Sequence, residues 1–264
     1  MPSLKRSARS NPPLIRILAV ALIGCAIGFI YNQYSTLASN RLIKGRICLV
    51  IDDFGFAFNE TVKGFFKLDK NITAAIIPGT SYGEAIGDYA DSLGIETIVH
   101  MPMETYEEDP PIPSDFILHD RLNAVEVEKR IKKAFEEITT AAGMSNHQGS
   151  KATESLQLMK DVARTLKKLE KYFLDSFTNP ESRGFITMRR YGVKTELRQV
   201  FLDHLESPGH IQRQLDSLAL LSQDMDVAIG IGHVKPTTLQ VLKTEIPRLQ
   251  SEGYQFIRLS QAVR

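Results

Sequence analysis

The stretch Cys48-Leu49-Val50-Ile51-Asp52-Asp53-Phe54-Gly55 joins an apolar run to two adjacent carboxylates and a glycine. The apolar run predicts a short buried strand, and the glycine marks the point where the chain turns away. Neighbouring side chains on a strand point to opposite sides, but at a fraying strand end both carboxylates can reach one cleft. There they repel each other and lose hydration, a cost that a bound cation would offset and a shared proton would reduce. Alternatively, one aspartate caps the following helix and the other is solvated.

Five later stretches also place polar or ionisable side chains directly after a short apolar or β-branched run. These are His100-Met101-Pro102-Met103-Glu104, Asn146-His147-Gln148-Gly149-Ser150, Leu174-Asp175-Ser176, Phe201-Leu202-Asp203 and Gly230-Ile231-Gly232-His233. In α/β barrels the chemistry is carried by the carboxyl ends of the strands. The six stretches together therefore predict one site at that edge.

Strand and helix patterns alternate along the chain, which predicts an α/β fold with a mainly parallel sheet. Expected strands cover residues 47–51, 72–77, 97–100, 144–146, 172–174, 200–202, 227–231 and 256–259. Expected helices cover 58–68, 81–93, 122–142, 153–169, 207–221 and 237–249, and residues 177–190 form a loop with a helical portion. Seven or eight short strands fit a closed or nearly closed barrel, with an open doubly wound sheet as the alternative. No glycine-rich phosphate loop supports a nucleotide fold.

The N-terminal region has the pattern of an export signal. Basic residues precede the uncharged, mostly apolar residues 17–31, a length between that of a signal peptide and that of a transmembrane span. We expect residues 1–38 to be a signal peptide or membrane anchor, 39–45 a linker and 46–264 the catalytic domain. A further alternative is lipidation at Cys25, in Leu22-Ile23-Gly24-Cys25. The segment could also be a buried N-terminal helix of the domain, with no role in export. The expected location is the periplasm or cell envelope, with residues 14–31 as an inner-membrane anchor if they are not cleaved.

The composition excludes several other classes. A formal net charge of +1 argues against nucleic acid as a partner. The two cysteines, Cys25 and Cys48, provide no disulfide framework. The absence of Trp argues against an extended surface for stacking sugars. The oligomeric state stays open.

Asp53, His100 and His147 would offer one oxygen and two nitrogen ligands with an open fourth position, the layout of a catalytic zinc site. Asp52 could then act as general base towards a metal-bound water, and His233 could protonate the leaving group. Such a set would hydrolyse an amide or an ester.

Other residues have two interpretations each. Glu104 lies four residues after His100 and could be a ligand, although Pro102 argues against a shared helical face. Asp175 and Asp203 could orient the ligating histidines or cap helices. The remaining histidines, His119, His204 and His210, are expected at the surface.

In their order along residues 46–264, the Asp52-Asp53, His100, His147, Asp175 and His233 stretches resemble the divergent polysaccharide deacetylase family, remote relatives of the NodB-type carbohydrate esterases. The resemblance implies a distorted (β/α) barrel and a divalent metal, usually zinc. It implies hydrolysis of acetyl groups from an N- or O-acetylated polysaccharide or a peptidoglycan-like substrate. It also implies Asp52 as base, Asp53 as ligand and His233 as acid.

The chain departs from the family pattern at three places. Glu104 stands where a second histidine would follow His100, so His147 is the candidate for that ligand. No arginine-proline motif is visible, and Val234-Lys235 separate His233 from Pro236. Two functions follow: a metal-dependent deacetylase, or a barrel that binds glycan or an envelope partner without turnover. A binding module would have no need of Asp52.

Overall fold

The structure, a computed structural model, describes residues 22, 24–29, 43–107 and 112–264. The chain divides into two compact units, Met1–Ile43 and Lys44–Arg264. In the first unit, residues 22 and 24–29 are helical and exposed, and the predicted end of the signal segment at residue 38 and most of the linker lie outside the described residues. Among the helices that are described, none has the length and apolar character needed to span a membrane.

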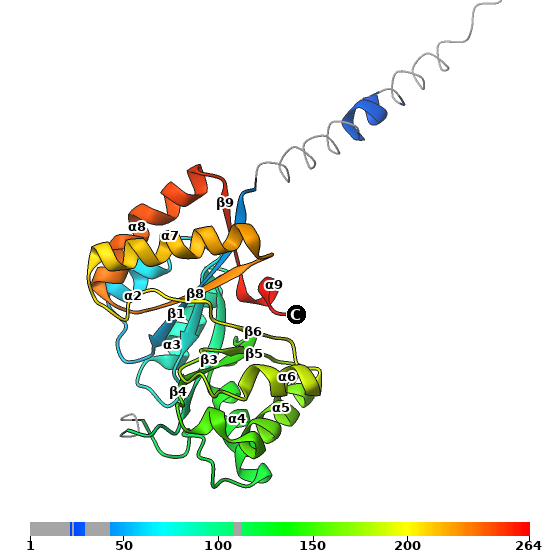
Figure 1. The fold of residues 1–264 in the computed structure, drawn as a ribbon, viewed down its shortest axis with the longest axis vertical. Coiled ribbons are helices and arrows are strands. Elements are labelled where there is room, and N and C mark those ends of the chain that lie inside the picture. Colours follow the sequence, from blue (N-terminus) through cyan, green and yellow to red (C-terminus); the bar gives the residue numbers. More distant parts are fainter. Residues whose placement is uncertain (1–21, 23, 30–42, 108–111) are drawn as a thin grey trace, which may run out of the picture. The chain divides into compact units, whose positions relative to one another are not determined.

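The second unit alternates strands and helices, as predicted (Figure 1). Its strands are β1 (Gly45–Phe54), β2 (Thr73–Ile76), β3 (Glu96–Met103), β4 (Gly143–Gln148), β5 (Tyr172–Asp175), β6 (Thr195–Leu197), β7 (Val200–Phe201), β8 (Ala228–His233) and β9 (Tyr254–Ile257). Its helices are α2 (Glu60–Phe65), α3 (Gly83–Ser92), α4 (Ala124–Glu137), α5 (Leu156–Lys168), α6 (Gly184–Tyr191), α7 (Pro208–Asp224), α8 (Pro236–Ser251) and α9 (Leu259–Ala262), with a 3₁₀ turn at Ala152–Glu154.

The strands form one curled parallel sheet in the order β6-β5-β4-β3-β2-β1-β8-β7, and β9 adds to β1. The predicted α/β fold, a distorted barrel of parallel strands, is confirmed. The strand β6 was not predicted, and the helix predicted to reach residue 142 ends at Glu137. No ladder joins β6 to β7, the two ends of that order, in the part of the chain that is described.

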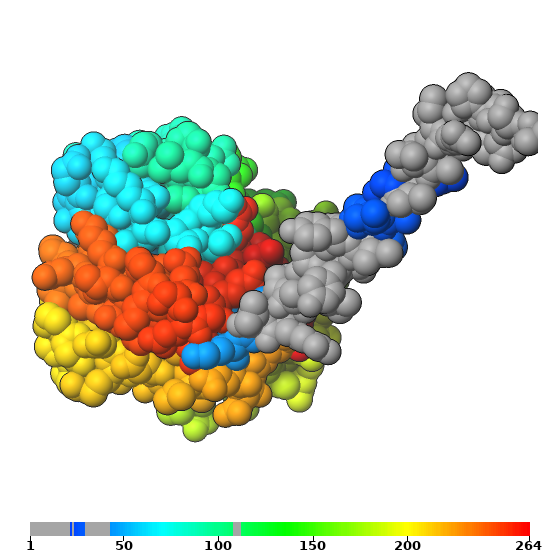
Figure 2. Space-filling view, turned by 90° about the horizontal axis from the view of Figure 1, so that it is seen from above, coloured from blue at the N-terminus to red at the C-terminus, as the bar shows by residue number. Residues whose placement is uncertain are grey.

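Two apolar cores support this sheet. Side chains on its inner face, among them Val50, Ala75 and Ile231, fill the barrel. Leu259 and Val263 of the C-terminal segment close the barrel at the amino ends of its strands. The larger core lies between the sheet and the surrounding helices. Figure 2 shows part of that outer layer, where orange-red α8 lies between the cyan segment containing α2 and the yellow-to-orange α7. Because all strands are parallel, their carboxyl ends lie together at the other edge of the sheet, opposite the edge that the C-terminal segment covers.

Candidate metal centre and active site

The two adjacent aspartates of β1 are brought to one side by a β-bulge. Ile51 pairs with Ala74 and Phe54 with Ile76, so Asp52 and Asp53 together stand opposite a single residue of β2. Asp53 adopts the left-handed backbone conformation, with φ of 69°. A bulge re-aims side chains at a strand edge. The predicted mechanism, a fraying strand end, is therefore wrong, because the strand continues through Phe54 and the bulge does the turning.

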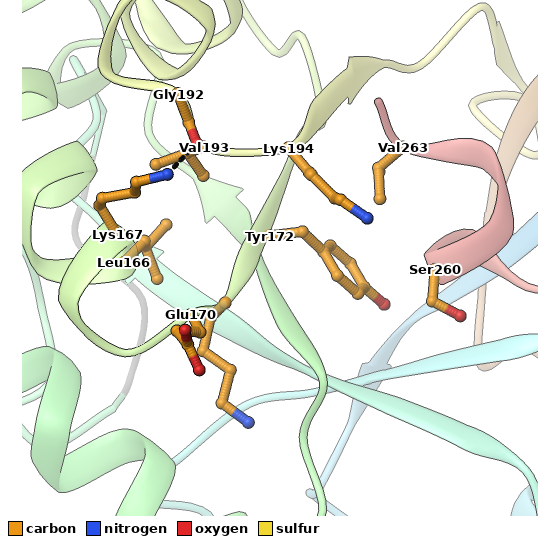
Figure 3. A pocket seen from close by; sticks show the side chains of 10 residues that line it. Leu166, Lys167, Glu170, Tyr172, Gly192, Val193, Lys194, Ser260 and Val263 are labelled. Carbon is orange, nitrogen blue, oxygen red and sulfur yellow. Dashed lines mark hydrogen bonds between the residues drawn. The ribbon is translucent and has the colours of Figure 1, made fainter.

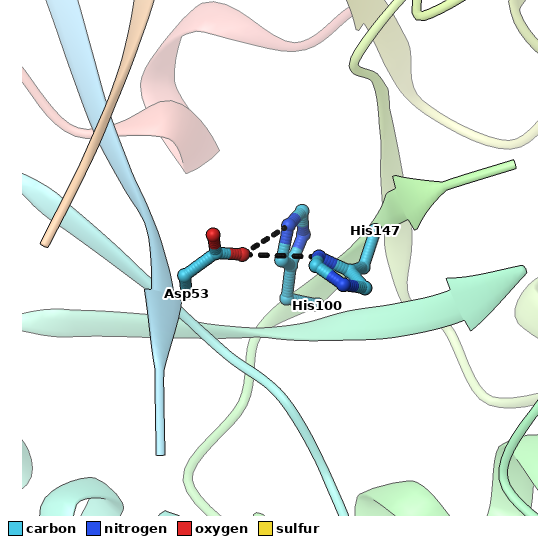
Figure 4. Close-up of side chains that lie close together, drawn as sticks. All are labelled: Asp53, His100 and His147. Atoms are coloured by element: carbon cyan, nitrogen blue, oxygen red, sulfur yellow. Dashed lines mark ion pairs between the residues drawn. The ribbon is translucent and has the colours of Figure 1, made fainter. Parts of the chain in front are cut away.

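Asp53, His100 and His147 converge from three strands, with ligand atoms within 4.8 Å of one another (Figure 4). Asp53 Oδ1 lies 3.0 Å from His147 Nδ1 and 3.5 Å from His100 Nε2. The other ring nitrogen of His100, Nδ1, lies 2.7 Å from Ser145 Oγ, and both side chains are buried. An Nδ1–H tautomer would donate to Ser145 and leave the Nε2 lone pair directed at the carboxylates.

These contacts bring the three groups together without satisfying Asp53. Its Oδ1 is buried and accepts no well-aligned hydrogen bond from the described residues. Burial opposes ionisation, but the nearby imidazoles of His100 and His147 hold the pKa of Asp53 well below its usual range. An ionised carboxylate oxygen and two imidazole nitrogens form a donor set that suits a divalent cation.

Asp52 has a different environment from its neighbour. Its side chain is buried, its Oδ2 lies 3.4 Å from His100 Nε2, and its Oδ1 has no hydrogen-bond partner among the described residues. Burial raises the pKa of Asp52, and the charges of His100 and His233 oppose that increase. The pair therefore consists of one strongly acidic carboxyl group and one that holds its proton more readily, as a ligand and a base would differ.

His233 ends β8 on the other side of Asp53, with its Nε2 3.9 Å from Asp53 Oδ2. Its Nδ1 lies 2.8 Å from Asp203 Oδ1, and its backbone N–H donates to Asp203 Oδ2. Thr238 Oγ1 also donates to that oxygen, which fixes the carboxylate. Burial lowers the pKa of His233, but Asp203 and the charges of Asp52 and Asp53 raise it overall. Asp203 thus orients the proposed acid, whereas the sequence interpretation had it orient a ligating histidine or cap a helix.

Two other predicted residues lie outside this cluster. Glu104 is buried against Lys151, with 2.9 Å between Oε1 and Nζ, and it accepts the backbone N–H of Asp120. Asp175 accepts the backbone N–H groups of Phe177 and Phe185 and the hydroxyl of Ser182. Neither carboxylate contacts His100 or His147 in the described structure, so Glu104 anchors the loop after β3 and Asp175 serves as the cap that the sequence left as its alternative.

Of the three histidines expected at the surface, His204 is exposed, and His119 and His210 are buried. His119 and His210 are each 7% exposed. His119 lies 3.7 Å from Glu104, and His210 Nε2 lies 3.2 Å from the exposed His204 Nδ1. Their partners come from loops that no local sequence pattern connects to them.

Arg198, which sequence reasoning missed, also lines the cleft. It follows the unpredicted strand β6, and its guanidinium lies over the Phe201 ring at 5.1 Å. Burial lowers its pKa, while the charges of Asp52 and Asp175 raise it. A single arginine between Leu197 and Gln199 carries no motif, and only the converging strands place it at the site.

The cleft has a volume of about 400 Å³ and is lined by both aspartates, the three histidines, Arg198 and a set of polar and aromatic side chains. Another pocket, of about 370 Å³, lies beside the start of β5 (Figure 3). Its lysines surround Tyr172, whose hydroxyl already donates to Glu96. No histidine or acid pair lines it, so the chemistry-bearing groups belong to the first cleft.

The sequence profile of the divergent polysaccharide deacetylase family matches residues 49–263. An uncharacterized protein of Haemophilus influenzae is 31% identical over 228 residues, which cover 85% of this chain and 79% of that protein.

Solved structures show the same fold. An uncharacterized protein of Agrobacterium tumefaciens C58 superposes with a TM-score of 0.78 at 17% identity, over 85% of this chain and 94% of that one. A Bacillus anthracis protein described as a CE4 family pseudoenzyme superposes with a TM-score of 0.53 at 13% identity, over 82% of this chain and 64% of that one.

Proposed function

This chain belongs to the divergent polysaccharide deacetylase family, and from that premise we propose that it is a metal-dependent hydrolase that removes acetyl groups from an N- or O-acetylated cell-envelope glycan. The observation that carries the proposal is the convergence of Asp53, His100 and His147 from three strands onto one point. Asp52 and His233, a base and an acid by environment, flank that point.

The residues present fit a divalent cation, with zinc as the first candidate. One carboxylate oxygen and two imidazole nitrogens leave a position open, and Asp53 Oδ1 is buried without a satisfying hydrogen bond among the described residues. When bound, such an ion would polarise the acetyl carbonyl and lower the pKa of a water.

The remaining steps fall to side chains of this chain. Asp52 takes the proton of the attacking water, for which its buried Oδ1, without a partner among the described residues, is available. The C–N or C–O bond of the acetyl group breaks as His233 Nε2 gives a proton to the leaving nitrogen or oxygen. Asp203 holds Nδ1 and so keeps the ring in place throughout. The products are acetate and a free amine or hydroxyl on the sugar.

We place this activity in the cell envelope. The support is the sequence alone: basic residues precede the uncharged residues 17–31, as in an export signal or membrane anchor. A substrate of the acetylated polysaccharide or peptidoglycan type would then be at hand.

The test is metal analysis of the purified full chain, followed by measurement of acetate released from acetylated chito-oligosaccharides and from peptidoglycan. We expect about one zinc per chain, and acetate release that Asp52→Asn abolishes while zinc is retained. Release that is unchanged in Asp52→Asn would refute the assigned base. Lack of any metal would refute the centre itself.

A barrel that binds glycan without turnover is the alternative function. A fold neighbour described as a pseudoenzyme supports keeping it. Zinc binding and glycan binding with no acetate release from any glycan would favour this alternative over the deacetylase.

A further inference from the structure

Arg198 has a donor that the fold does not use. Its Nε donates to Ser176 O at 2.7 Å and its Nη2 to Phe177 O at 2.9 Å, which fixes the guanidinium plane. Its Nη1 has no hydrogen-bond partner among the described residues. The ion pairs of the cleft join histidines to Asp52, Asp53 and Asp203, and none involves Arg198 in the described parts of the chain.

No acid of the cleft lining forms an ion pair with this guanidinium in the described parts of the chain, although the charges of Asp52 and Asp175 act on it from beyond contact distance. Asp52 and Asp53 are the acids of the lining, and Arg198 is its one arginine or lysine. Arg198 is therefore a cation without an ion-pair partner among the described residues, and its planar donors match the geometry of a carboxylate.

The wall beside Arg198 has further unpaired polar atoms. Gln148 Oε1 and Ser176 Oγ are buried and have no partner among the described residues, and both residues line the cleft. Gln148 and Phe177 also adopt left-handed backbone conformations, with φ of 54° and 50°. Buried polar atoms without partners are costly, and backbone strain of this kind gathers at ligand-binding sites.

We propose that the acetylated sugar taken by this cleft carries a carboxylate, which pairs with Nη1 of Arg198, while Gln148 and Ser176 take hydroxyl groups of the same sugar. The inference rests on the proposed function, since it names the substrate class of that same site. It selects acidic amino sugars over neutral ones.

The test compares an acid with its own methyl ester, which removes the charge without touching the protein. The probes are N-acetylmuramic acid, with its carboxylate on a lactyl ether, and N-acetylglucosaminuronic acid, with its carboxylate on the ring. Binding is measured by calorimetry to the zinc-loaded full chain carrying Asp52→Asn, so that no sugar is consumed. We expect at least one acid to bind roughly 10- to 100-fold more tightly than its ester, the range for a charge-assisted hydrogen bond. Which acid does so identifies the position of the carboxylate.

Arg198→Gln in the same background should reduce the ratio of acid to ester affinity to near one. The matched control is Lys235→Gln, which removes a positive charge at the same edge of the sheet, from a lysine paired with Glu206 outside the cleft lining. That variant should keep the ratio. Equal binding of both acids and their esters would overturn the proposal even if Arg198→Gln failed to fold, as would an equal loss in Lys235→Gln. Because these readouts are affinities, they stand apart from acetate release, whose absence would refute only the deacetylase.

Discussion

Asp53 and Asp52 are adjacent in sequence, yet their environments differ in the way that two roles require. The carboxylate of Asp53 faces two imidazoles, while Asp52 is buried with one oxygen unpaired among the described residues. The sequence predicted Asp53 as ligand and Asp52 as base, but it could not supply the physical difference between the two carboxylates. That difference depends on which strand ends lie beside each carboxylate.

Replacing a proposed metal ligand should reduce the zinc content of the protein, whereas replacing the proposed base should leave it unchanged. We expect Asp53→Ala, His100→Ala and His147→Ala each to reduce zinc content after dialysis, because a three-ligand site loses a third of its donors. Asp52→Ala should retain zinc, measured by mass spectrometry of the metal.

Glu104→Gln is the matched control, because it alters a buried carboxylate at the end of β3 that contacts Lys151 instead of the cluster. Zinc loss in Glu104→Gln equal to that in Asp53→Ala would mean that the ligand set is wrong.

The alkaline limb of the activity profile should depend on Asp203. Although burial opposes it, the hydrogen bond that His233 Nδ1 donates to the Asp203 carboxylate raises the pKa of His233, so the protonated acid persists to higher pH. Activity falls as pH rises through that pKa, because the neutral imidazole cannot protonate the leaving group. Asp203→Asn removes the charge that raises the pKa, and the limb should move to lower pH. The measurement is kcat against pH.

His233→Ala should remove the alkaline limb and reduce turnover by roughly 10²- to 10⁴-fold, the range for a lost acid or base, with zinc unchanged. An alkaline limb that stayed in place in both variants would exclude His233 from proton transfer.

At the scale of the element, the bulge in β1 depends on the glycine that follows it. Gly55 has φ of +133°, and a Cβ there would lie 2.1 Å from Thr80 Oγ1, whose hydroxyl donates to Ile77 O. Gly55 therefore allows the chain to leave the sheet directly after Phe54, one residue beyond the two aspartates.

Gly55→Ala should destabilise the domain by about 1–3 kcal/mol from backbone strain alone, and the overlap with Thr80 adds to that. Gly94→Ala is the control, since its φ is +68° but no atom lies within 4 Å of the added Cβ. That substitution should cost only about 1–2 kcal/mol. Urea denaturation measures both, and equal costs would show that the approach to Thr80 is unimportant.

Sequence periodicity predicted the elements that bury apolar residues and missed those that do not. Ile47–Ile51 and Val227–Ile231 read as strands because they are apolar; the structure extends the first at both ends, and starts the second at Ala228 and extends it to His233. Thr195–Leu197 has a charged residue at its centre and pairs, among the described residues, with β5 alone, so its pattern resembles a loop. Arg198 was missed as a cleft residue for the same reason, because it directly follows β6 and the unpredicted strand positions it.

At the scale of the whole molecule, the carboxyl edge of the parallel sheet gathers residues separated by up to 181 positions, from Asp52 to His233. The sequence could predict this gathering, because parallel strands align their carboxyl ends whatever their order. It could not predict which carboxylates turn away, as Glu104 and Asp175 do, because their partners Lys151 and Ser182 lie in loops.

The two ends of the chain should contribute differently to the stability of the domain. Both apolar cores lie within Lys44–Arg264, so a fragment beginning at Lys44 should fold and stay in solution without residues 1–43. Its circular dichroism and urea midpoint should match those of the full chain in detergent. An unfolded or insoluble fragment would make the N-terminal segment part of the fold and would weaken the export proposal.

Removal of Leu259 to Arg264 from the same fragment should, in contrast, destabilise the fold. Leu259 and Val263 are 0% and 6% exposed because they fill the lower end of the barrel, and Arg264 O accepts the backbone N–H of Thr195 at the edge strand β6. Loss of one buried leucine side chain costs about 2–5 kcal/mol, which is a large part of the 5–15 kcal/mol that stabilises a domain. The shortened fragment should therefore unfold at much lower urea, and an unchanged midpoint would show that the C-terminal segment does not close the barrel.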